Sequence, residues 1–254
     1  MPLLLAQEAP AGIDPAGYLV SEKYDGVRAC WDGRTLRSRA GLALAAPGWF
    51  TAALPPVPLD GELWLGRGRF EEVSAAVHRR EPVDATWRRM RFMIFELPGA
   101  EGPFSERAAR IHALAGRVGE GALVAVEQAV VNGAAALQRR LQQVVREGGE
   151  GLVLHRAVAP YVTGRSAVLL KLKPQQDGEA VVVGHLPGQG RHAGRLGALR
   201  VRTAQGVEFR IGTGLSDALR QAPPPLGSIV TFTYRGCTAG GVPRFASYLR
   251  LRDA

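Results

Sequence analysis

The sequence predicts an α+β protein built in two parts, a larger domain with mainly antiparallel sheets and a smaller all-β domain. Two observations support this prediction. Before Pro174, strand-like runs alternate irregularly with helical patterns, whereas after it helical patterns almost vanish and short strand-like runs follow one another. At 254 residues, the chain is long enough for one large or two modest domains with their own cores.

The first part is expected to begin with an irregular lead-in over residues 1–17, because Pro10 and Pro15 argue against a long helix there. Farther along, the Asp32–Gly33 pair predicts a hairpin turn, and Asn132 is expected to cap a helix. Strands are expected at 18–20, 27–31, 59–65, 90–97, 123–128, 150–154 and 168–173, and helices at 70–79, 105–118 and 134–146.

After Pro174 the sequence predicts a small β-barrel of the OB type, because short strand-like runs separated by glycine-rich turns are typical of that barrel. The glycine-rich stretch 188–194 lacks the Gly-Lys-Ser/Thr of a phosphate-binding loop and is assigned to a turn of the barrel. We therefore predict one domain over residues 1–175 and an OB-fold domain over residues 176–254. The barrel strands are expected at 179–185, 199–203, 207–212, 228–234 and 245–251.

A net charge of +9 and a pI near 10.3 indicate a polyanionic partner, and nucleic acid is favoured over a membrane surface. Residues 176–254 carry ten arginines, no lysine and five acidic residues, and such an arginine-rich barrel is typical of nucleic-acid binding. No apolar run is long enough to span a membrane, so no membrane association is expected. The apolar stretch 1–6 is too short for a complete leader.

Cysteine and histidine give little information about function. Cys30 and Cys237 match no metal-binding spacing, and they do not indicate a cellular compartment. The five histidines also show no ligand spacing, so they are assigned no catalytic role.

The lysines are the most informative basic residues. Among 32 arginines and lysines, only three are lysines: Lys23, Lys171 and Lys173. Arginine stays protonated, whereas a lysine amine can lose its proton and attack an electrophile. Lys23 stands two residues before the Asp25–Gly26 pair, between strand-like runs that can hold its amine in a cleft. The three lysines are therefore candidates for amine chemistry or phosphate contacts, with chance surface lysines as the alternative.

Six short stretches follow one another along nearly the whole chain. They are KYDGVR at 23–28, SRAG at 38–41, DGEL at 60–63, FMIFEL at 92–97, EGLVL at 150–154 and KLK at 171–173. Each is weak alone, but the ordered set resembles the covalent nucleotidyltransferase superfamily of ATP-dependent DNA ligases, RNA ligases and mRNA capping enzymes. The resemblance implies an antiparallel-sheet nucleotidyltransferase (adenylation) domain followed by an OB-fold.

The resemblance implies that the Lys23 amine attacks the α-phosphate of ATP, which gives lysyl-AMP and releases pyrophosphate. Lys171 and Lys173 nearby would favour the neutral, reactive amine and offset charge on the phosphates. Glu62 and Glu150 are hard oxygen ligands suited to Mg²⁺, with Mn²⁺ as a second possibility.

Other residues are assigned to the nucleotide on the same resemblance. Phe95 is expected to stack on adenine, although without the resemblance it would be assigned to the core together with Phe92. Arg28 and Arg39 suit forked contacts to phosphate or ribose oxygens, or to the 5′-phosphate of a nick. Glu22, next to the nucleophile, is also assigned to nucleotide binding. The residues expected to take part in catalysis are Lys23, Arg28, Lys171 and Lys173.

Within the superfamily, the chain resembles the minimal bacterial ATP-dependent DNA ligases of the E group, because it is small and has only a barrel after Lys173. This implies nicked duplex DNA as the partner, a monomer without an obligate protein partner, and a periplasmic location, with the cytoplasm as the alternative. The stretch 241–250 occupies the place of the terminal motif, which implies that Arg244, Arg250 or Arg252 faces the ATP phosphates. The residues expected at the nucleic acid are Arg39, Arg191, Arg195, Arg235, Arg244 and Arg250.

The chain departs from the ligase pattern at two positions. Glu96 stands where aspartate is usual, which puts a metal role there in doubt, and Gly178 stands where alanine is usual, so a looser hinge is expected. The alternatives to DNA ligation are RNA ligation by the same chemistry, mRNA capping, and a non-catalytic OB-type nucleic-acid-binding protein. The intact lysines and glutamates count against the last.

Overall fold

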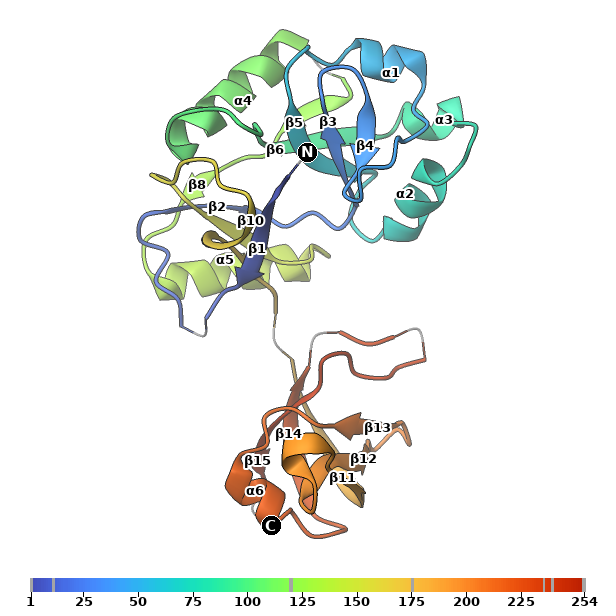
Figure 1. Cartoon of the computed structure of the whole chain (residues 1–254), viewed down its shortest axis with the longest axis vertical. Helices are drawn as coiled ribbons and strands as arrows, with labels where there is room; N and C mark the ends of the chain where they lie inside the picture. Colours follow the sequence, from blue (N-terminus) through green and yellow to red (C-terminus); the bar gives the residue numbers. More distant parts are fainter. Residues whose placement is uncertain are drawn as a thin grey trace. The chain divides into compact units, whose positions relative to one another are not determined.

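Two five-stranded sheets form the first unit of the chain, residues 1–173 (Figure 1). The computed structural model describes residues 2–10, 12–118, 121–174, 176–234, 236–238 and 240–252. The first sheet has the order β1-β10-β9-β2-β8 and the second β4-β3-β5-β6-β7; β1–β10 and β6–β7 are parallel and the other pairs antiparallel. The strands are β1 Leu4–Glu8, β2 Tyr18–Glu22, β3 Val27–Trp31, β4 Leu36–Ser38, β5 Leu59–Trp64, β6 Arg91–Glu96, β7 Leu123–Ala125, β8 Ala129–Val130, β9 Leu152–Arg156 and β10 Gly164–Leu172.

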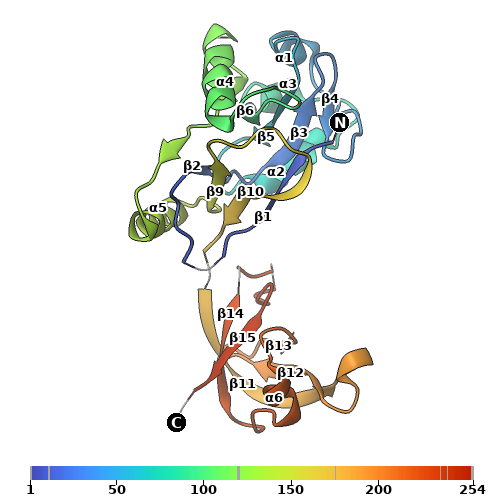
Figure 2. The same cartoon turned by 60° about the vertical axis from the view of Figure 1, so that its left-hand side comes forward.

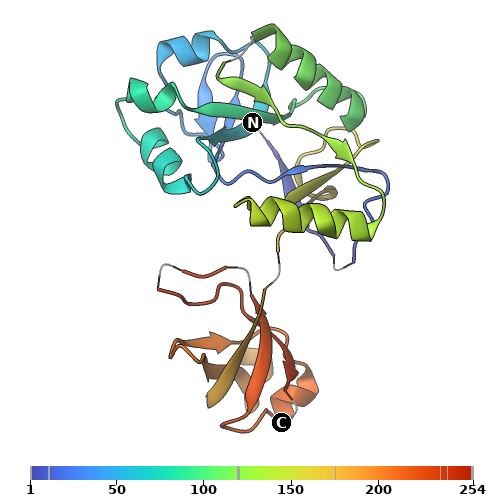
Figure 3. The same ribbon diagram turned by 180° about the vertical axis from the view of Figure 1, so that it is seen from behind.

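Helices cover the outer faces of these sheets. Leu137, Leu141 and Val144 of α5 follow a helical period and pack on the first sheet, where α5 is seen from behind in Figure 3. Phe50 and Trp87, which meet edge to face, join the larger core of the second sheet. The helices are α1 Gly48–Ala52, α2 Phe70–Val77, α3 Asp84–Trp87, α4 Phe104–Val118 and α5 Ala134–Arg146.

The structure confirms the predicted mixture of helices and antiparallel strands, but two local expectations in this unit are wrong. The lead-in is not irregular, because Leu4–Glu8 forms β1 and pairs in parallel with β10. Asn132 does not cap α5; the N-cap is Gly133, with φ of 84° and no capping side chain. The hairpin at Asp32–Gly33 is confirmed, since β3 and β4 pair on either side of it.

The second unit, residues 174–254, is a five-stranded barrel with the order β13-β12-β11-β14-β15. Strand β11 bends, as Figure 2 shows, so that residues 176–181 pair with β14 and residues 181–187 pair with β12. A bridge between Thr213 and Ser247 links the ends of the strand order. All five predicted strands are confirmed, and the additional helix α6 was not expected. The elements are β11 Gln176–Pro187, β12 Leu196–Arg202, β13 Glu208–Ile211, α6 Asp217–Gln221, β14 Ile229–Tyr234 and β15 Ser247–Leu251.

Gly178 has a packing role inside β11, and the looser hinge expected at this position stays a prediction. It pairs with Phe232 of β14, and a Cβ at position 178 would lie 2.7 Å from Phe232 Cζ. The phenylalanine ring, which is buried in the barrel core, therefore fills the space that an alanine side chain would need.

Two further features bear on the sequence-based expectations. Cys30 is buried in the first unit and Cys237 is exposed in the second, and both are free thiols. Among the helices of the described residues, none is long and apolar enough to cross a membrane.

Candidate active site

A cavity of about 320 Å³ lies in the first unit, with walls from both sheets. Strands β1, β2, β9 and β10 supply one wall, and strands β3, β5 and β6 supply residues of the other. The cavity gathers residues that are far apart in sequence, and most of the predicted nucleotide-binding residues line it. They are Glu22, Lys23, Arg28, Arg39, Glu62, Phe95, Lys171 and Lys173.

Strand register explains how the first sheet aligns these side chains. Ser21 of β2 and Lys171 of β10 both pair with Val153 of β9, so the three residues lie on one row across the sheet. Lys23 N donates to Gly151 O at 2.9 Å, which places the nucleophile two residues beyond Ser21, just past the end of β2. Because side chains alternate between faces, residues two apart on one strand point into the same cavity.

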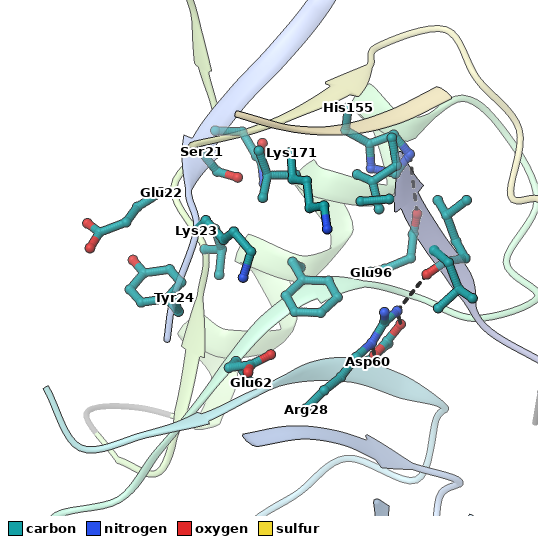
Figure 4. A pocket seen from close by; sticks show the side chains of 18 of the residues that line it. Ser21, Glu22, Lys23, Tyr24, Arg28, Asp60, Glu62, Glu96, His155 and Lys171 are labelled. Atoms are coloured by element: carbon teal, nitrogen blue, oxygen red, sulfur yellow. Dashed lines mark hydrogen bonds and ion pairs between the residues drawn. The ribbon is translucent and has the colours of Figure 1, made fainter. Parts of the chain in front are cut away.

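Glu150 lies between two of the three lysines. Its carboxylate accepts from Lys23 Nζ at 2.6 Å and also forms an ion pair with Lys173. Figure 4 shows the amino groups of Lys23 and Lys171 and the carboxylate of Glu62 directed towards one space. Glu150 therefore holds the Lys23 amine at the cavity, because a short hydrogen bond between charged groups is strong.

Lys171 has a weaker partner. Its Nζ lies 2.9 Å from Glu8 Oε1, and the side chains are 28% and 44% exposed, respectively. An ion pair with that much solvent access contributes little to stability, so phosphate oxygens can compete for the Lys171 ammonium group. Lys171 is thus positioned to contact an anion in the cavity.

Arg28 is held in a fixed orientation by a buried carboxylate. Its Nε and Nη2 donate to Asp60 at 3.0 and 2.6 Å, and Nη2 also donates to Leu4 O at 2.8 Å. The guanidinium carbon lies 5.4 Å from the centre of the Phe95 ring, within cation–π range. Asp60 is fully buried. The Arg28–Asp60 ion pair therefore holds the guanidinium beside the Phe95 ring in an orientation that a ligand in the cavity can contact.

Glu62 and Glu150 are the oxygen donors that could hold a divalent cation. Burial raises the pKa of Glu62 to about 7, although Lys23 and Arg28 lower it. A cation beside Glu62 would favour its charged form, and two carboxylates with phosphate oxygens are a donor set that Mg²⁺ accepts. Among the described residues, no three His, Cys, Asp or Glu side chains cluster as a protein-only metal site.

Glycines in the short motifs are required by close backbone approach. A Cβ at Gly26 would overlap Leu63 O of β5, and a Cβ at Gly151 would overlap Leu172 O of β10. Each glycine lies immediately before a strand, β3 or β9, and beside the strand with which that strand pairs. The Asp-Gly and Glu-Gly pairs therefore mark the places where the backbone next to Lys23 and Glu150 packs closely on a neighbouring strand.

The sequence did not reveal the partner of Glu22. Arg67 donates to both oxygens of Glu22, at 2.9 and 2.8 Å, and also reaches the Glu147 carboxylate at 2.9 Å. The predicted nucleotide contact of Glu22 would therefore have to come from its backbone, because its carboxylate is occupied. Nothing in the sequence distinguishes Arg67 from the many other arginines.

A buried cluster beside the cavity was also missed. Arg107, fully buried, donates to both oxygens of Glu96 at 2.7 and 2.8 Å, which gives Glu96 a structural role. His155 lines the cavity, stacks on Phe104 at 3.6 Å between ring centres, and is 4% exposed. Burial, together with the Arg107 charge, lowers the pKa of His155 to about 3. This histidine had been given no role at the site.

The predicted nucleic-acid contacts are only partly described. Arg39 lines the cavity, whereas Arg191, Arg195, Arg244 and Arg250 are exposed on the barrel. Arg235 lies outside the described residues. Their contact with nucleic acid stays a prediction.

Comparison with known proteins decides the family. Over 234 residues, 92% of this chain and 86% of the relative, the sequence is 38% identical to the DNA ligase of Haemophilus influenzae. The chain belongs to the DNA ligase family. Residues 187–252 match the DNA ligase OB-like domain, which confirms the predicted OB-type barrel.

Solved structures agree with this family. The chain is similar to a Lig E DNA ligase from a study of DNA binding with a minimal scaffold, with 42% identity, a TM-score of 0.79 and 99% of each chain covered. The resemblance to the E group is therefore confirmed. Chlorella virus DNA ligase-adenylate, at 21% identity and a TM-score of 0.58 over 100% of this chain and 99% of that one, shares the fold. The protein is thus an enzyme of the ATP-dependent DNA ligase family, whose activity is nick sealing.

Proposed function

We propose that this protein seals nicks in duplex DNA with ATP, in three steps that use Lys23 as the nucleophile. First, Lys23 Nζ attacks the α-phosphorus of ATP; a P–N bond forms, pyrophosphate leaves and the amine gives up a proton. Second, the 5′-phosphate of the nick attacks the same phosphorus, so the P–N bond breaks and a phosphoanhydride joins AMP to the DNA. Third, the 3′-hydroxyl attacks the 5′-phosphate, AMP leaves and the strand is closed.

The observation that carries this proposal is the ion-pair cluster of Lys23, Glu150 and Lys173 at the cavity. A nucleophile must be held in place, and positive charge must face the phosphates as they react. Glu150 holds the Lys23 amine at 2.6 Å, and Lys171 would release the partly exposed Glu8 when a triphosphate arrives.

Glu62 and Glu150 would hold Mg²⁺, or Mn²⁺, together with phosphate oxygens of the nucleotide. When bound, the ion would neutralise phosphate charge and polarise the P–O bonds. The donor set supports this assignment, because Mg²⁺ is commonly bound through one or two carboxylates and substrate phosphates.

Exposed arginines of the barrel would bind the DNA backbone. Phosphate contacts position a protein on the duplex without selecting a sequence, which suits an enzyme that must act at any nick. We assign this role to Arg191, Arg195, Arg244 and Arg250, with Arg39 contacting the 5′-phosphate from the first unit. Binding should therefore weaken steeply as the salt concentration rises.

The test is sealing of a labelled nicked DNA duplex with ATP and Mg²⁺, beside a nicked RNA duplex of the same sequence. Sealing of the DNA substrate supports the proposal. AMP attached to Lys23 without DNA sealing would move the assignment to RNA ligation or another acceptor. With neither product, the protein would be a non-catalytic nucleic-acid-binding protein.

We also propose that the enzyme works as a periplasmic monomer. The periplasmic location rests on the relationship to the E group, and the monomer on one chain holding the whole cavity. Fractionation of cells that produce the native protein and light scattering of the purified protein test these two points. Recovery with cytoplasmic markers, or the mass of a dimer, would contradict them.

A further inference from the structure

Gln128 carries a polar group in the active-site cavity that no atom of the described residues satisfies. Its side chain lines the cavity, and its Oε1 is buried without a hydrogen-bond partner among the described residues. Buried amide oxygens in native proteins are nearly always bonded to protein, water or a ligand. An unpaired oxygen in a cavity wall therefore points to a hydrogen-bond donor on the molecule that fills the cavity.

The position of Gln128 is set by strand β8. Residues 129 and 130 pair with Val20 and Leu19 of β2, so the register places Gln128 opposite Ser21, immediately before β8 begins. Ser21 shares its row with Val153. The row that faces the cavity therefore runs from Lys171 through Val153 and Ser21, and Gln128 lies at its far end from Lys171.

The same row faces the expected base-binding surface. Phe95 comes from β6 of the second sheet and Val153 from β9 of the first, and both line the cavity. A purine stacked between these two side chains would lie over β9. One edge of the base would then point across the first sheet towards β2 and β8. Ser21 and Gln128 are the polar side chains that line the cavity there.

The primary amide of Gln128 matches adenine. It offers an acceptor and a donor side by side, and adenine presents its N6–H₂ donor beside a ring-nitrogen acceptor on either edge. We propose that Gln128 recognises the N6 amine of ATP through Oε1, which makes it a specificity-determining residue of the adenylation step. Rotation of the amide towards the base would satisfy the oxygen that is unpaired without nucleotide.

This inference rests on the proposed adenylation of Lys23, and the test separates the two. Single-turnover adenylation is measured with ATP and with purine riboside triphosphate, which lacks the N6 amine. The wild type is expected to favour ATP by roughly tenfold or more, the effect of one hydrogen bond made to a buried group. Comparable rates with the two nucleotides in the wild type would overturn the inference.

Variants then locate the recognition at residue 128. In Gln128→Leu the preference for ATP should fall about tenfold, while the rate with purine riboside triphosphate stays close to that of the wild type. Gln128→Glu keeps the acceptor and should keep most of the preference. The control is Gln142→Leu, the same change at an exposed position of α5, which should alter neither rate.

A purely structural role would lower both rates equally and leave the preference unchanged, and that result would also overturn the inference. No adenylation with either nucleotide in the wild type would instead contradict the proposed function.

Discussion

Acid sensitivity of the first unit should depend on His155. Its ring is stacked on Phe104 and is 4% exposed, and burial lowers its pKa from 6.5 to about 3. At a pH between these two pKa values, His155 binds a proton in the unfolded chain but not in the folded chain. Stability is therefore lost as the pH falls below 6.5. From pH 7 to pH 5 the loss from this group is about 2 kcal/mol in the free energy of unfolding.

This loss in the free energy of unfolding is insensitive to the pKa of His155 in the folded state, because pH 7 and pH 5 both lie above that pKa. The assay is urea unfolding of wild type and His155→Gln at pH 7 and pH 5, followed by tryptophan fluorescence, since all four tryptophans lie in the first unit. The variant should lose about 2 kcal/mol less than the wild type over this range. His78→Gln, at an exposed histidine, serves as the control. Equal losses in wild type and His155→Gln would refute the reasoning.

Three further substitutions test the packing and the site. Glu150→Gln should slow adenylation by about a hundredfold in a single-turnover assay, because it releases the Lys23 amine from its position; an unchanged rate would contradict this. Arg107→Met leaves Glu96 buried and without its ion-pair partner, and it should destabilise the first unit by about 3–5 kcal/mol in urea unfolding. A loss below about 1 kcal/mol would contradict a buried Arg107–Glu96 ion pair. Gly178→Ala should destabilise the barrel by about 1–3 kcal/mol, read from its thermal transition, and a higher midpoint would show that the core ring moves freely.

The fold was predictable where local patterns repeat. Alternating apolar residues and glycine-rich turns identified all five barrel strands, and the Asp32–Gly33 pair identified a hairpin. Strand β1 was missed because its pairing partner, Gly164–Leu172, is distant in sequence and its neighbouring prolines favour an irregular chain. Parallel pairing between distant segments leaves no short-range signal.

The site was predictable where the chemistry restricts the residue type. A lysine before Asp-Gly, one of three in a chain that uses arginine at its other basic positions, identified Lys23. Gln128, Arg67 and His155 were missed because glutamine, surface arginine and single histidines are common. Gln128 and His155 reach the cavity only through strand pairing, and Arg67 contacts Glu22 from a loop. Their roles depend on tertiary contacts that no motif records.

The central claim is that Lys23 becomes covalently linked to AMP, and peptide mass spectrometry of the protein after incubation with ATP and Mg²⁺ tests it most directly. We predict one AMP per chain, located on Lys23, removed by added pyrophosphate or nicked DNA, and absent from Lys23→Arg, which keeps the charge but cannot attack. AMP on another residue, or an adduct that persists in Lys23→Arg, would contradict the account.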